Sequence, residues 1–74
     1  MQKKSKGFMA YLDEREVRTI GNDLIVENKP HKIAISGSLD ITKDKEGLKN
    51  AYELKRIIDA TIEVLKYEDL PEKI

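Results

Sequence analysis

The 74-residue chain contains no cysteine and no tryptophan, and it has a single histidine, His31. The absence of cysteine excludes disulfides, cysteine-ligated zinc, iron–sulfur clusters and a thiol nucleophile. One histidine also excludes a histidine-rich metal centre. No segment approaches the ~20 apolar residues of a membrane span, and no apolar run of signal-peptide length follows the basic start. We therefore expect one small cytoplasmic domain without a cofactor, a metal or a membrane contact.

The chain also lacks an excess of charge of either sign. Lysine plus arginine and aspartate plus glutamate both number 14, and charged residues make up 38% of the sequence. A dedicated DNA-binding protein draws much of its affinity from excess positive charge, which is missing here. Aromatic residues make up only 5%, and all of them lie outside the strands predicted below, so the sheet offers no stacking platform for single strands. These features argue against nucleic acid as a partner.

Three strands are predicted from β-branched and alternating apolar residues. Residues 16–20 and 24–26 flank Gly21-Asn22-Asp23, a turn sequence, and form a hairpin. A second turn at residues 28–31 leads to a third strand. Its apolar residues Ile33, Ile35, Leu39 and Ile41 alternate with Ala34, Ser36, Ser38 and Asp40. Gly37 interrupts this alternation, which indicates a bulge or a close backbone approach.

A long helix follows, with Thr42 or Asp44 as its N-cap. Gly47 weakens the first turn, so the regular helix is expected to begin near Leu48 and to end near Tyr67, before Leu70-Pro71. The fold class is therefore α+β, a three-stranded antiparallel meander followed by one C-terminal helix packed on one face of the sheet. We assign residues 1–12 to a flexible basic arm with a short apolar segment, and residues 13–74 to the domain.

A helical wheel separates two apolar stripes on the predicted helix. The broad stripe should cover the sheet and contains Leu48, Ala51, Leu54, Ile58, Ile62 and Leu65, with Tyr52 at its margin. The remaining predicted core is Val17, Ile20, Leu24, Val26, Ile33, Ile35, Leu39 and Ile41. A second stripe of Ile57, Ala60 and Val64 falls outside the centre of the first. A small domain gains stability from association, so we assign this second stripe to a homodimer or partner interface.

The alternative is that residues 8–12 fold back over the second stripe within one chain. The sequence does not decide whether this segment is a strand or a helical turn. On the dimer hypothesis, Ile57→Asp dissociates the dimer without unfolding the monomer.

The candidate motifs for catalysis and metal binding are each incomplete. The alternation of Asp40, Thr42, Asp44 and Glu46 resembles a calcium loop, but lysine occupies its glycine position and alanine its bidentate-glutamate position. Ser36-Gly37-Ser38 is neither a nucleophile elbow nor a phosphate loop. An enzyme is therefore not expected.

Three functions stay open. The first is a homodimeric accessory or regulatory module that acts through protein contacts, without catalysis. The second is a weak nucleic-acid-binding regulator that uses the basic arm, Lys3, Lys4 and Lys6. The third is a ligand or enzyme site between subunits, built on the small polar strand face of Ser36, Ser38 and Asp40.

Overall fold

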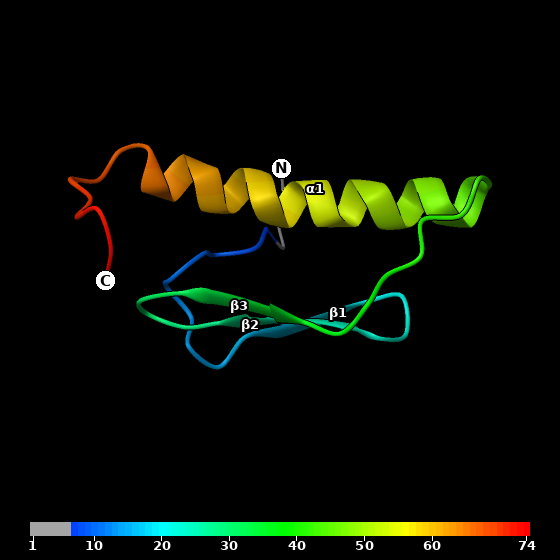
Figure 1. The fold of residues 1–74 in the computed structure, drawn as a ribbon, viewed down its shortest axis with the longest axis horizontal. Helices are drawn as coiled ribbons and strands as arrows, with labels where there is room; N and C mark the ends of the chain where they lie inside the picture. The colour runs from blue at the N-terminus through cyan, green and yellow to red at the C-terminus, as the bar shows by residue number, and fades with distance from the viewer. Residues whose placement is uncertain (1–6) are drawn as a thin grey trace.

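The computed structural model describes residues 7–74 and confirms the predicted α+β class. Three strands, β1 (Val17–Ile20), β2 (Leu24–Asn28) and β3 (Ile33–Ser36), form one antiparallel sheet in the order β1-β2-β3. One helix, α1 (Lys45–Leu65), follows the sheet and lies along one of its faces (Figure 1). Within the described residues, no helix is long and apolar enough to cross a membrane.

The register of the sheet places four apolar residues, Ile20, Leu24, Val26 and Ile35, on the face toward α1. Ile20 pairs with Leu24 across the β1–β2 turn, and Val26 pairs with Arg18 on one side and Ile35 on the other. Since paired residues point to the same side of a sheet, this face carries the strand part of the core. Ile20, Leu24 and Val26 are all buried, as the sequence predicted.

The third strand is shorter than predicted because the backbone turns at Gly37. Gly37 has φ +93°, and a Cβ at this position would collide with the carbonyl oxygen of Asp23. A side chain is excluded there by both the conformation and the space. The strand therefore ends at Ser36, and residues 37–44 form a loop. As a result Ile41, expected in the core, is exposed.

The segment before the sheet belongs to the core, in contrast to the predicted boundary at residue 13. Phe8 and Ala10 are buried against Ile20 and Ile57, and residues 7–12 run between α1 and the sheet (Figure 1). The segment is neither strand nor helix. The amide of Leu12 donates to the carbonyl of Met9 at 3.0 Å, which closes a turn with Tyr11 at φ +67°.

Asp44 is the N-cap of α1, one of the two predicted candidates. Its extended backbone and its carboxylate, which accepts from the Gly47 amide at 2.8 Å, define the cap. The helix begins at Lys45, before Gly47, and ends at Leu65. Gly47 does not delay the helix. It is buried, and a Cβ there would collide with the Thr42 carbonyl, so the close approach of loop and helix requires glycine.

The face of α1 that meets the core differs from the prediction. The side chain of Ile57 is 3% exposed and Ala60 and Val64 pack against the same core, whereas Ile58 is 38% and Ile62 51% exposed. The proposed interface stripe is thus covered within one chain by the Phe8 segment, as in the fold-back alternative. Ile57→Asp would place a charge in the core rather than at a subunit contact.

The physical reason is the added layer before the sheet. The helical-wheel prediction treated the sheet as the only surface that covers α1. In the structure, Phe8 and Ala10 also pack in the core with Ile57 of α1. The helix packs chiefly against β1, so the inward-facing Ile35 on the edge strand β3 stays exposed. Val17, also expected in the core, is exposed because it lies on the face of the sheet opposite α1. Leu48 is exposed because it lies on the opposite side of α1 from the buried Ile57.

Candidate functional site

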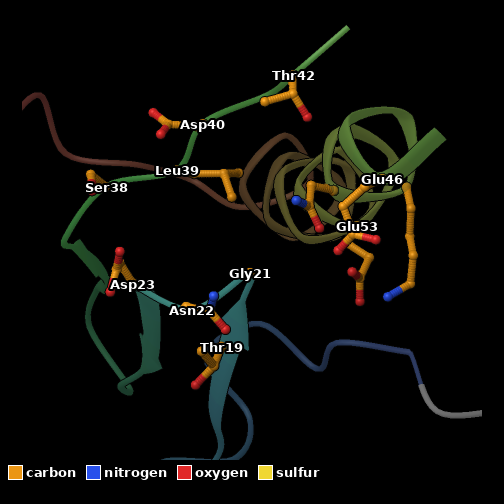
Figure 2. Close-up of a pocket in the computed structure, with 12 residues that line it drawn as sticks. Thr19, Gly21, Asn22, Asp23, Ser38, Leu39, Asp40, Thr42, Glu46 and Glu53 are labelled. Carbon is orange, nitrogen blue, oxygen red and sulfur yellow. The ribbon is translucent and has the colours of Figure 1, made fainter. Parts of the chain in front are cut away.

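A polar cleft lies where the β1–β2 turn, the loop before α1 and the first half of α1 meet (Figure 2). It has a volume of about 440 Å³. The turn contributes Thr19, Gly21, Asn22 and Asp23, and the loop contributes Ser38, Leu39, Asp40 and Thr42. The helix contributes Glu46, Lys49, Asn50 and Glu53. Small-molecule sites commonly fall in the range of roughly 300–1,000 Å³, so the cleft is large enough for a small ligand.

Two glycines allow the walls of this cleft to approach each other closely. Gly21 adopts φ +64° in the β1–β2 turn, and a Cβ on it would lie 3.1 Å from the Cδ1 atom of Leu39. Gly37 allows the loop backbone to lie directly against Asp23. The loop is therefore seated on the hairpin turn, which brings Ser38 and Asp40 beside Asp23 although some 15 residues separate them in the chain.

The charge of the cleft is negative. Four carboxylates line it, those of Asp23, Asp40, Glu46 and Glu53, against the single ammonium group of Lys49. A concave surface lined mainly by one sign of charge concentrates the opposite charge. The same carboxylates do not form a metal centre, because the described residues include no group of three or more His, Cys, Asp or Glu placed to hold an ion.

Asn50 is the most unusual residue of the cleft. It is 6% exposed, and within residues 7–74 its carboxamide forms no hydrogen bond. Buried polar side chains in folded proteins almost always have a partner. Asn28, the other buried polar residue within residues 7–74, follows this rule, since its carboxamide bonds to Tyr11, Met9 and Glu16.

The rim of the cleft next to the helix start is fixed by a small network. The hydroxyl of Thr42 donates to Asp44 at 2.7 Å, and the Gly47 amide donates to the same carboxylate. Both hydrogen bonds lower the pKa of Asp44 below its ordinary value of 3.8, and the bond from Thr42 has the larger effect. Thr42, at the cleft wall, is thus held in place by the N-cap of α1.

The structure separates the residues of the predicted polar strand face. Ser38 and Asp40 line the cleft, but Ser36 is the last residue of β3 and lies outside it. The turn at Gly37 is the reason, because it breaks the alternation that placed all three on one face. His31 lines a different hollow, together with Tyr11, Pro30 and Leu65. Lys3, Lys4 and Lys6 lie outside the described residues.

The sequence did not identify Asn50 and Glu53, two of the four helix residues of the cleft, as site residues. A signal was present: Asn50 lies four and seven residues before Leu54 and Ile57, so it shares their side of the helix. Asparagine is also a poor helix former in a helix interior. A polar residue of this kind on a buried arc points to either a hydrogen-bond network or a ligand.

Within residues 7–74 the fold is thus a small α+β domain with one helix over a three-stranded meander, with a polar, acidic cleft at one end. Comparison of the chain with protein-family models, curated proteins and solved structures yields no match.

Proposed function

We propose that the chain is a small non-catalytic interaction module that pairs with a second copy of itself. The observation that carries this proposal is an apolar stripe on α1 whose side chains are 38–57% exposed. We define the exposed stripe as Leu48, Tyr52, Ile58 and Ile62. It replaces Ile57, Ala60 and Val64, which already serve the core.

The exposed stripe has the dimensions of a helix–helix contact. From Leu48 to Ile62 it extends along about 21 Å of helix at 1.5 Å per residue, over an arc of about 120°. Each end carries two large apolar side chains four residues apart, which are neighbours on a helix surface. Burial of such side chains against a partner is the main driving force of association.

The order of residues along the exposed stripe is self-complementary. In an antiparallel pair with a two-fold axis near Lys55, Leu48 of one copy lies opposite Ile62 of the other, and Tyr52 lies opposite Ile58. A two-fold contact of this kind uses the same patch on both subunits.

The charges of α1 fit the same arrangement. Lys66 of one copy is level with Asp44 of the other, so opposite charges meet at both ends. Lys55 at the centre already bonds Asp59 of its own helix at 2.7 Å, which compensates its charge near the axis.

The test is the oligomeric state over a range of protein concentrations, measured by sedimentation equilibrium. Wild type should associate, and Ile58→Asp should raise the dimer dissociation constant by at least about tenfold, because a buried isoleucine contributes roughly 1.5–3 kcal/mol. Ile25→Asp is the matched control. Ile25 is also 38% exposed, but it lies on the face of the sheet opposite α1, so its substitution should leave the dimer intact.

Two results would contradict the proposal. One is a wild-type chain that stays monomeric at millimolar concentration. The other is a dimer that Ile25→Asp weakens as much as Ile58→Asp does.

A further inference from the structure

We propose that the polar cleft binds a small organic cation that carries an amide group, such as an arginine or lysine derivative, with Asn50 as the residue that recognises the amide. This site is independent of the exposed stripe. The proposal rests on two separate observations, the sign of the charge around the cleft and the unpaired carboxamide inside it.

The carboxylates of the cleft favour a ligand with delocalised positive charge. Asp23 and Asp40 extend from the turn and the loop, while Glu46 and Glu53 lie on the helix side of the cleft (Figure 2). Carboxylates on opposite walls favour a ligand whose positive charge and hydrogen-bond donors are spread over several atoms. A guanidinium group fits this description, because its planar set of N–H donors binds carboxylates in pairs.

The carboxamide of Asn50 favours a ligand that carries an amide. Its side chain is more than nine-tenths buried, lines the cleft and is without a hydrogen-bond partner in residues 7–74. A carboxamide offers both a carbonyl acceptor and two N–H donors. A ligand amide satisfies both at once, because it donates to the Asn50 oxygen and accepts from the Asn50 nitrogen. This selects an amide-bearing cation over a simple amine.

Hydroxyl groups of the cleft provide neutral hydrogen-bond acceptors. Ser38 and Thr42 also line the cleft, and Thr42 is held by Asp44. Their oxygens add acceptors for ligand N–H groups without adding charge. The cleft therefore combines charge for attraction with neutral groups for orientation.

The experiment is a titration of the ¹⁵N-labelled full chain with L-argininamide, followed by amide chemical shifts in the NMR spectrum. We expect saturable shifts in the amides of residues 19–23, 38–42 and 46–53. Agmatine, which has the same guanidinium group without the carboxamide, should bind about tenfold more weakly, the effect of one to two hydrogen bonds. Magnesium chloride at equal ionic strength should leave these shifts unsaturated.

The decisive variant is Asn50→Leu, which keeps a similar side-chain size and removes the carboxamide. It should fold with unchanged or higher stability, since no hydrogen bond is lost. Its affinity for L-argininamide should fall about tenfold, to that of agmatine, while its affinity for agmatine stays unchanged. Equal affinity of Asn50→Leu and wild type for L-argininamide would overturn the role of Asn50.

A second pair of variants tests the charge of the cleft independently of Asn50. Glu53→Gln removes a carboxylate from the cleft, and Glu63→Gln removes one from an exposed part of α1. Only the first should weaken binding of L-argininamide. If both variants weaken it equally, or if magnesium ions produce the same saturable shifts, the cleft attracts cations without recognising them and the proposal fails.

Discussion

The side-chain oxygen of Asn28 accepts a hydrogen bond from the backbone amide of Tyr11 at 2.7 Å, across 17 residues of sequence. The nitrogen of the same side chain donates to the Met9 carbonyl at 2.7 Å and to Glu16 at 3.2 Å. One buried asparagine in β2 thereby fixes the backbone turn that brings Phe8 and Ala10 under the helix. Phe8 and Ala10 in turn belong to the same core cluster as Ile57, on the buried face of α1.

Loss of the Asn28 network should release the segment before the sheet. Asn28→Leu leaves the Tyr11 amide without a partner and removes one of the two hydrogen bonds to the Met9 carbonyl. We therefore expect the free energy of unfolding to fall by about 2–3 kcal/mol. Asn50→Leu is the matched comparison, because Asn50 is almost equally buried but forms no side-chain hydrogen bond in residues 7–74. Urea denaturation measures both variants. Equal losses of stability would show that the Asn28 hydrogen bonds do not hold the segment.

Truncation of the helix residue beneath Phe8 tests the packing directly. Ile57→Ala removes three buried carbons at a site that is 3% exposed, and it should destabilise the chain by about 2–4 kcal/mol. Ile62→Ala, half exposed on the same helix, should cost less than about 1 kcal/mol. The comparison is made at low protein concentration, where association does not contribute to the measured stability. A larger loss of stability for Ile62→Ala than for Ile57→Ala would indicate that the buried face of α1 is the one predicted from the sequence.

Replacing Gly47 by alanine should lower stability, in contrast to the usual effect of this substitution in a helix. Replacing an exposed helical glycine by alanine generally stabilises a protein by up to about 1 kcal/mol. Here the Cβ of alanine would collide with the Thr42 carbonyl, so Gly47→Ala should destabilise by about 1–3 kcal/mol instead. Gly7→Ala, where the added Cβ meets nothing within 4 Å, is the control. A stabilised Gly47→Ala variant would mean that the loop before α1 moves freely away from the helix.

The N-cap predicts a pH dependence of defined sign. Hydrogen bonds from Thr42 and Gly47 lower the pKa of Asp44 in the folded chain, so the unfolded state binds the proton more readily. The contribution of the cap is therefore present above pH 3.8 and is lost as the pH falls through the lower folded-state pKa. Asn also caps helices but does not titrate. The difference in free energy of unfolding between wild type and Asp44→Asn should shrink or reverse on acidification, as measured by urea denaturation from pH 6 to pH 3. A difference that is constant over this range would contradict the prediction.

Much of the architecture was predictable because it depends on local signals. The turn residues Gly21-Asn22-Asp23, the alternation at Ile33 and Ile35 and the capping aspartate Asp44 act through neighbouring backbone atoms. Such effects are readable from short stretches of chain. The order of elements and the antiparallel sheet followed from them.

The helix orientation and the cleft required information that no local pattern contains. The sequence by itself determined that α1 is apolar on more than one side. The buried side is the one that contacts Phe8 and Ala10, in a segment that bonds to Asn28 through Tyr11 and Met9 and that a helical wheel does not include. In the same way, only the tertiary structure decided that Asp23, Asp40 and Glu53 share one cleft, because the backbone approach of Gly37 to Asp23 folds the loop onto the turn. Periodicity specifies where apolar residues lie on one element, and long-range contacts select which of them are covered.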